Sequence, residues 1–162
     1  MEIKEAIELF FIVVTGIATT GTFLFNFLDR KPKCEIRFRV HTGQIGLVDI
    51  PELRVTVTNT GRTDLFVESV WILSEKYKNG FFVDLSSGSG ISKGILLAPK
   101  RRLRKQVFLD KVLDSLGTEA LEQQEIQLWV EVYTEIGKVY HSKKLSLSPE
   151  QVDQALKGSV RR

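Results

Sequence analysis

A run of twenty residues without a charged side chain, residues 9–28, constrains this chain more than any other feature. A helix rises about 1.5 Å per residue, so this run would span roughly 30 Å, the hydrocarbon thickness of a bilayer. A soluble domain of this size seldom buries a helix on all sides. The acidic start and the lack of an Ala-x-Ala site after the run disfavour a cleaved signal peptide. The sequence therefore predicts an uncleaved transmembrane anchor within residues 1–30.

Basic residues collect on one side of this run and predict its orientation. Lys4 stands alone before it, whereas Arg30, Lys31 and Lys33 follow it. Cytoplasmic flanks of membrane helices are enriched in Lys and Arg. We therefore expect a single-pass protein of the inner (cytoplasmic) membrane, with the N-terminus outside and the C-terminal domain in the cytoplasm. The lipid bilayer would be its first partner.

Polar residues recur along one face of the predicted helix. Thr15, Thr19, Thr22 and Asn26 are separated by three or four residues, and Gly16 lies near that face. In lipid, such a face gains from hydrogen bonds to a second helix, which predicts a homo-oligomer or a complex with a partner membrane protein. Two alternatives stay open. The threonines could bond to carbonyls of their own helix, or the face could line a small multi-helix pore.

After Pro32 the pattern changes to short alternating segments separated by turn residues. Ile36, Phe38 and Val40 alternate with arginines, which is the period of a half-buried strand. About seven or eight such segments fall within residues 33–147, and no βαβ alternation occurs. This rhythm is typical of an antiparallel β-sandwich.

Two short helical segments are expected beside the strands. Residues 110–124 carry apolar positions at helical spacing and predict a crossing between sheets. Ser148, Pro149 and Gln151 form an N-cap, a first-turn proline and a capping-box partner. They predict a helix in a final segment, residues 148–162, that ends in a basic tail.

Two stretches resemble parts of bacterial immunoglobulin-like sandwich domains. Residues 53–70 contain an alternating strand, an Asn-Thr-Gly turn and a returning strand, and Leu97, Ala98 and Pro99 lead into a strand over residues 103–109. The whole arrangement is similar to small bacterial single-pass proteins with a membrane-anchored immunoglobulin-like domain. The resemblance implies a mainly β fold, with an N-terminal transmembrane helix followed by an antiparallel immunoglobulin-like β-sandwich. It implies no particular function.

The chain lacks the residue patterns of common catalytic and metal sites. It has a single Cys and two His, with no zinc-type spacing, nucleophile elbow or P-loop. We therefore predict no catalytic residues, no metal and no cofactor, and we do not expect an enzyme.

The most concentrated charge in the chain is a basic run at residues 100–105. It contains Lys100, Arg101, Arg102, Arg104 and Lys105. Such a run can contact anionic lipid or an anionic small ligand, or it can be a solvated strand that resists edge pairing. Nucleic acid is not expected, because no aromatic residue is interleaved with the cations.

The leading hypothesis from these features is a membrane-anchored, non-enzymatic binding or assembly module with a cytoplasmic β-sandwich. One rival is a membrane effector that is gated by a nucleotide-like anion and oligomerises through its helix. A second rival places the sandwich outside the cytoplasm, as an envelope component.

Overall fold

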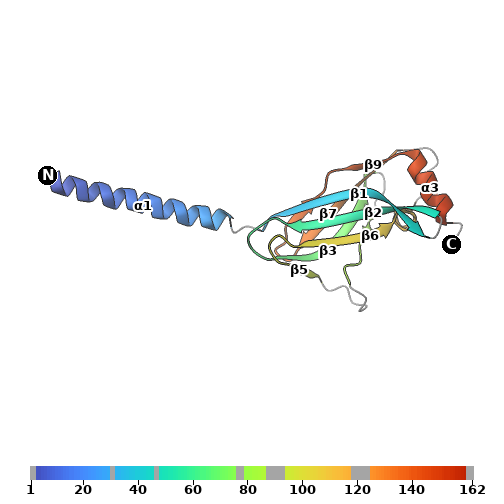
Figure 1. Ribbon diagram of the computed structural model, residues 1–162, viewed down its shortest axis with the longest axis horizontal. Coiled ribbons are helices and arrows are strands. Elements are labelled where there is room, and N and C mark those ends of the chain that lie inside the picture. The colour runs from blue at the N-terminus through green and yellow to red at the C-terminus, as the bar shows by residue number, and fades with distance from the viewer. Residues whose placement is uncertain are drawn as a thin grey trace.

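The computed structural model describes residues 3–29, 32–45, 48–75, 79–86, 94–117 and 125–159. These residues form α-helices and β-strands in a mainly β chain (Figure 1). In chain order the elements are α1 (Ile3–Asp29), β1 (Cys34–Ile45), β2 (Val48–Asn59), β3 (Leu65–Ser74), β4 (Phe81–Phe82), β5 (Ile95–Leu97), β6 (Arg102–Phe108), α2 (Leu109–Leu116), β7 (Ile126–Thr134), β8 (Val139–His141), β9 (Leu145–Leu147) and α3 (Pro149–Ser159).

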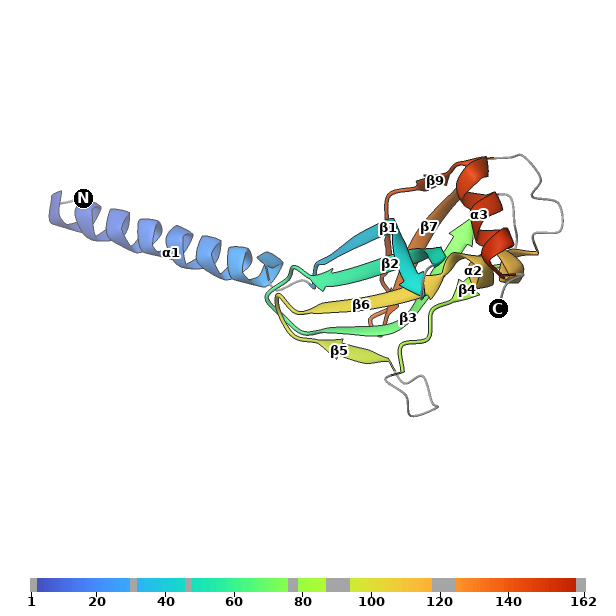
Figure 2. The ribbon, with the colours of Figure 1, turned by 45° about the vertical axis from the view of Figure 1, so that its right-hand side comes forward.

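The strands form two antiparallel sheets that face each other across one core (Figures 1 and 2). The three-stranded sheet has the order β1-β2-β6. The six-stranded sheet has the order β4-β3-β7-β8, with β5 paired to β3 and β9 paired to β7. This is the mainly β, antiparallel architecture that the alternating segments indicate.

Apolar side chains on alternate residues fill the space between the sheets. In β2, Leu53, Val55 and Val57 are buried, whereas Arg54 and Thr56 between them are partly exposed on the outer face. The six-stranded sheet contributes the buried side chains of Val67, Ile72, Leu128, Val130 and Val132. Burial of these side chains is the main favourable term for the fold.

The stretch expected to form a hairpin, residues 53–70, does not form one. β2 belongs to the three-stranded sheet and β3 to the six-stranded sheet, so the turn after Asn59 crosses between the sheets. The buried Asn59 side chain holds this crossing, because its Nδ2 donates to the carbonyls of Thr63 and Leu97, each at 2.8 Å. Its Oδ1 accepts the N–H of Gly61 at 2.9 Å.

A tight turn joins β7 to β8. Gly137 adopts φ 72° and donates its N–H to the carbonyl of Thr134 at 2.8 Å. Two three-residue strands, β8 and β9, follow this turn. Between them, the Ser142 hydroxyl accepts the N–H of Val130 at 2.9 Å, in place of a backbone carbonyl.

Two helices lie at the end of the sandwich opposite α1 (Figure 2). α2 buries Leu109, Val112, Leu113 and Leu116 and ends at Gly117, whose φ of 82° forms a left-handed C-cap. The predicted capping box is present at α3. Ser148 Oγ accepts the N–H of Gln151 at 3.3 Å, and Gln151 Oε1 accepts the N–H of Ser148 at 3.0 Å.

The predicted transmembrane anchor over residues 9–28 is wrong. The described part of the chain contains no helix of the length and apolarity needed to cross a membrane. Within residues 10–23 of α1, six residues are Thr or Gly. The predicted single-pass topology and inner-membrane location are therefore wrong as well.

Candidate functional site

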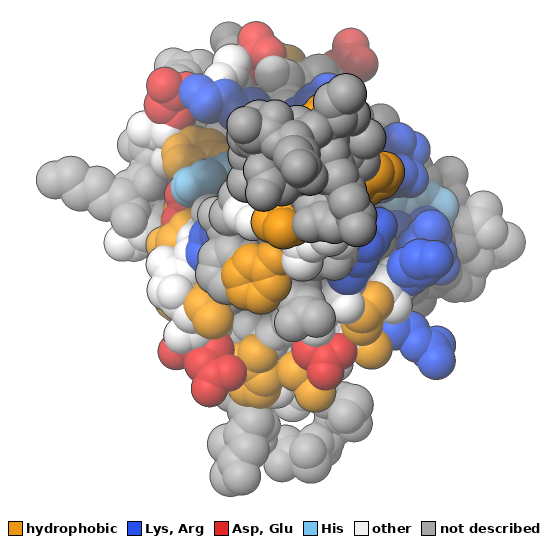
Figure 3. All heavy atoms as spheres, turned by 90° about the vertical axis from the view of Figure 1, so that its left-hand side faces the viewer, with side chains coloured by type: hydrophobic (Ala, Val, Ile, Leu, Met, Phe, Trp, Pro, Cys, Tyr) orange, Lys and Arg blue, Asp and Glu red, His pale blue; other side chains and the backbone are white. Residues whose placement is uncertain are grey.

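Outward-facing residues of β1, β2 and β6 place five arginines on one sheet surface. The strand register sets Arg39 opposite Arg54, and Thr56 lies between Arg37 and Arg104 on the neighbouring strands. We call this surface the arginine face; it consists of Arg37, Arg39, Arg54, Thr56, Arg102 and Arg104. Viewed from the α1 end, Lys and Arg side chains gather on one side of the domain (Figure 3).

The arginine face surrounds a shallow hollow of about 240 Å³. Neighbouring strands lie about 4.8 Å apart, and same-face residues along a strand lie about 6.7 Å apart. Guanidinium groups from three strands therefore reach a common space about 10 Å across. Thr56 brings a hydroxyl to the middle of this space, at the centre of the sheet.

One carboxylate contacts the arginine face at its border. Glu35 Oε1 accepts a hydrogen bond from Arg37 Nε at 2.7 Å, and both side chains are about half exposed. The hydrogen bond and charge of Arg37 lower the pKa of the Glu35 carboxyl, with a smaller contribution from Arg102. The same hydrogen bond raises the pKa of the Arg37 guanidinium.

Three other arginines of the face have no carboxylate partner in the described part of the chain. Among the described residues, no carboxylate pairs with Arg39, Arg54 or Arg104. Like charges directly opposite on neighbouring strands are destabilising, and Arg39 and Arg54 stand in that relation. The face therefore has a positive potential suited to an anion that bridges several guanidinium groups.

The basic run at residues 100–105 does not act as one surface. Arg102 and Arg104 belong to the arginine face, whereas Lys105 points to the other side of β6 and donates to the carbonyl of Ser86 at 2.9 Å. Lys100 and Arg101 form the turn before β6, where Lys100 adopts φ 64°. The sheet thus separates neighbouring cations of the run and joins two of them to arginines far away in the sequence.

Of the three predicted membrane-flank residues, the structure describes Lys33, which precedes β1. Arg30 and Lys31 are outside the described residues. The Lys33 side chain is exposed, and its carbonyl accepts the N–H groups of Thr60 at 2.9 Å and Gly61 at 3.2 Å. This part of the chain therefore ties β1 to the crossing after β2.

The residues expected to associate helices lie on α1. Thr19 Oγ1 donates to the carbonyl of Thr15 at 2.6 Å, and Thr22 Oγ1 donates to the carbonyl of Ala18 at 2.8 Å. These bonds within the helix match the alternative in which threonines satisfy their own carbonyls. Gly16 is exposed, and the Asn26 side chain lies outside the described residues.

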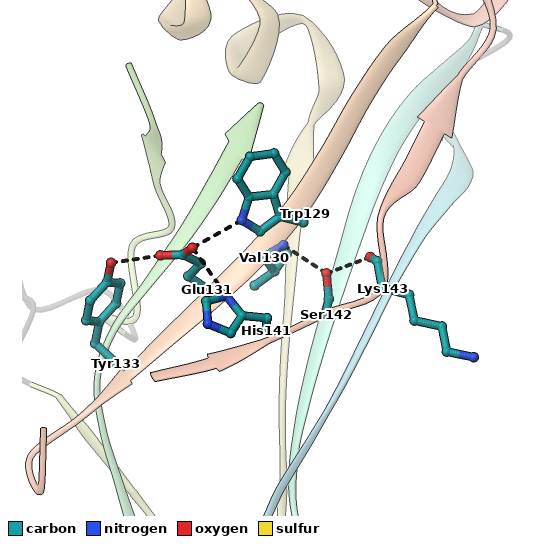
Figure 4. A network of polar contacts seen from close by, with 7 residues as sticks. All are labelled: Trp129, Val130, Glu131, Tyr133, His141, Ser142 and Lys143. Carbon is teal, nitrogen blue, oxygen red and sulfur yellow. Dashed lines mark hydrogen bonds and ion pairs between the residues drawn. The ribbon is translucent and has the colours of Figure 1, made fainter. Parts of the chain in front are cut away.

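A polar network lies on the outer face of the six-stranded sheet, and the sequence pattern does not predict it (Figure 4). Glu131 accepts hydrogen bonds from Trp129 Nε1 at 3.2 Å and Tyr133 OH at 2.8 Å. His141 Nδ1 lies 3.3 Å from Glu131 Oε1. The register that sets Glu131 opposite His141 is the feature that brings them together. The hydrogen bond to Glu131 raises the pKa of the Tyr133 hydroxyl.

This network is a set of cross-strand contacts rather than a metal centre. Within the described residues, no group of three or more His, Cys, Asp and Glu side chains is placed to hold a metal ion. The arginine face is therefore the best-developed candidate site, and its residue types suit recognition of anions.

Comparisons with known proteins give no identity to the chain. No protein-family model matches it, and no curated protein matches it. Among solved structures, it resembles a Bordetella pertussis protein named as ApaA, with 11% identity, coverage of 74% of this chain and 95% of that chain, and a TM-score of 0.38. It also resembles a protein from Archaeoglobus fulgidus, with 11% identity, coverage of 70% and 97%, and a TM-score of 0.37. These likenesses are too distant to carry an argument about function.

Proposed function

We propose that this protein is a non-enzymatic binding module whose arginine face binds the phosphate groups of a small anionic ligand. The observation that carries the proposal is the convergence of five arginines from three strands around one hollow, with a carboxylate partner at Arg37 alone among the described residues. Planar guanidinium groups bind phosphate through paired hydrogen bonds, which a solvated run of lysines does not reproduce.

The composition of the arginine face also suggests how selective it is. Its lining consists of arginines and Thr56, with no aromatic ring on which a base could stack. Recognition should therefore depend on the phosphates. We expect inorganic triphosphate and adenosine triphosphate to bind with similar affinity, and both to bind more weakly as salt screens the charges.

The test uses the full chain and inorganic triphosphate, with binding measured by isothermal titration calorimetry. Arg54→Gln and Arg104→Gln each remove one guanidinium group from the hollow while keeping a long polar side chain. A charge-assisted hydrogen bond contributes about 1.5–3 kcal/mol, so each substitution should weaken binding by at least about tenfold.

Arg101→Gln is the matched control. It removes the same charge from the same basic run, but Arg101 lies in the turn before β6 and does not line the hollow. We expect this variant to bind triphosphate as the wild type does. Equal weakening in all three variants would show a diffuse field instead of a site, and unchanged binding in Arg54→Gln would refute the proposal. Thermal unfolding of each variant checks that the fold is kept.

A further inference from the structure

A second surface lies along the free edge of β1 and shares Arg37 and Arg39 with the arginine face. The order β1-β2-β6 leaves one edge of β1 without a strand partner in the described part of the chain. β1 has 12 residues, which is long for an exposed edge strand. Alternate residues of such a strand present their N–H and C=O groups away from β2. These groups are available to pair with another extended chain.

A groove of about 510 Å³ runs beside this edge. We call it the edge groove; it is lined by Glu35, Ile36, Arg37, Phe38, Arg39, Lys143 and Lys144. β1 forms one wall, and the segment between β8 and β9 supplies the other wall. The groove therefore opens between the edges of the two sheets, on the side where the sandwich is not closed by a strand.

The break between β8 and β9 creates the second wall. The Ser142 hydroxyl accepts the N–H of Val130 at 2.9 Å and donates to the carbonyl of Lys143 at 2.8 Å. The Ser142 N–H still donates to the carbonyl of Val130 at 2.9 Å, but the hydroxyl replaces the backbone carbonyl as the acceptor, and the regular ladder with β7 is interrupted here. Figure 4 shows Lys143 directed away from β7, and Lys143 lines the groove together with β1.

Apolar and charged side chains alternate along the wall of the edge groove that β1 forms. Ile36 and Phe38 point inward and give an apolar floor, with Phe38 only 9% exposed. Arg37 and Arg39 point outward, and Lys143 adds a cation on the opposite wall. Lys144 is 2.8 Å from Glu75, and Glu35 is paired with Arg37, so Arg39 and Lys143 are the cations best placed to meet an acidic ligand.

We infer that the edge groove binds an extended acidic segment of a partner protein, which adds to β1 as an antiparallel or parallel strand. Pairing with the strand edge supplies backbone hydrogen bonds. Because apolar and charged side chains alternate along β1, a complementary segment places apolar side chains toward Ile36 and Phe38. It places acidic side chains toward Arg39 and Lys143. The segment that fits is therefore a run of alternating apolar and acidic residues.

The edge groove and the hollow of the arginine face share Arg37 and Arg39, and substitutions at residues that line only one of them separate the two proposals. Lys143 lines the edge groove and not the hollow of the arginine face, whereas Arg54 lines the hollow and not the groove. A loss of phosphate binding in Arg54→Gln with intact peptide binding, and the reverse in Lys143→Glu, would show two separate surfaces.

The probe is a capped seven-residue peptide of alternating Val and Glu, titrated into the full chain and followed by calorimetry. Two further peptides have the same side chains and are N-methylated at one or the other set of alternate amides. In an added strand only one set faces β1, so one methylated peptide should bind at least about tenfold more weakly and the other about as well as the parent. Equal binding of both methylated peptides, or no binding of the parent, overturns the proposal.

Substitutions and hydrogen exchange complete the test. Lys143→Glu should weaken binding of the parent peptide several-fold, and Arg54→Gln should leave it unchanged. Peptide binding should also slow amide exchange over residues 35–39. If the protein alone self-associates and Lys143→Glu restores the monomer, the occupant of the groove is a second copy and the partner-segment proposal is wrong.

Discussion

Replacing Asn59 by alanine should lower the free energy of unfolding by about 3 kcal/mol. The Asn59 side chain is fully buried and makes three hydrogen bonds, two to the carbonyls of Thr63 and Leu97 and one from the N–H of Gly61. Each bond contributes about 1 kcal/mol net, and the variant also leaves backbone groups unpaired in the interior. The lost hydrogen bonds hold the crossing between the two sheets. The whole sandwich should therefore unfold at a lower urea concentration.

Urea unfolding followed by tryptophan fluorescence measures this loss. Trp71 and Trp129 are the two tryptophans of the chain and lie on neighbouring strands of the six-stranded sheet. Asn79→Ala is the control, because Asn79 is exposed and should change stability by less than about 0.5 kcal/mol.

Asn59→Asp provides the sharper comparison. It keeps the acceptor for Gly61 but places a carboxylate oxygen against the carbonyls of Thr63 and Leu97, so it should destabilise at least as much as alanine at neutral pH. A loss below about 1 kcal/mol in Asn59→Ala, or wild-type stability in Asn59→Asp, would refute the reasoning.

Three further predictions concern the core, a turn and the cysteine. Leu109→Ala empties a fully buried position and should cost about 2–5 kcal/mol in chemical unfolding, whereas Leu96→Ala, at a side chain 60% exposed, should cost less than about 0.5 kcal/mol. Gly137→Ala should cost about 1 kcal/mol by the same assay, because φ at this turn residue is 72°, and a neutral result would contradict the turn geometry. Burial, with a smaller effect of Glu35, raises the pKa of the Cys34 thiol to about 11. Thiol labelling of the folded protein should therefore be slow at pH 8 and accelerate toward pH 11, and a rate at pH 8 equal to that of the unfolded chain would contradict the burial.

The strands of the sandwich are readable from the sequence because alternation reports burial directly. Leu53, Val55 and Val57 alternate with polar residues, and the capping box at Ser148 and Gln151 has a local cause that spacing reveals. The alternation does not indicate which strands pair with each other. The Asn-Thr-Gly turn after β2 predicts a hairpin, but the same residues support a crossing between sheets, since the partners of Asn59 come from residues as distant as Leu97.

The residues of the candidate site are likewise only partly predictable from the sequence. The basic run at residues 100–105 is conspicuous in the sequence, yet alternation along β6 sends Arg104 outward and Lys105 toward Ser86. Arg54 carries no local signal, and it joins the site only because β2 lies between β1 and β6. At the N-terminus, the charge-free run predicts a membrane span, whereas the described residues contain no helix of the length and apolarity needed to cross a membrane.

The two edges on the open side of the sandwich differ in length, and this difference bears on solubility. Ser142 divides one edge into two strands of three residues, too short to template a foreign strand, whereas β1 offers 12 continuous residues. The charges of Arg37 and Arg39 disfavour pairing of this long edge with the same edge of another copy. A polyanion would neutralise these charges, and high salt would screen them. We therefore expect phosphate-rich polymers or high salt to make copies of the protein associate through the β1 edge before any other surface.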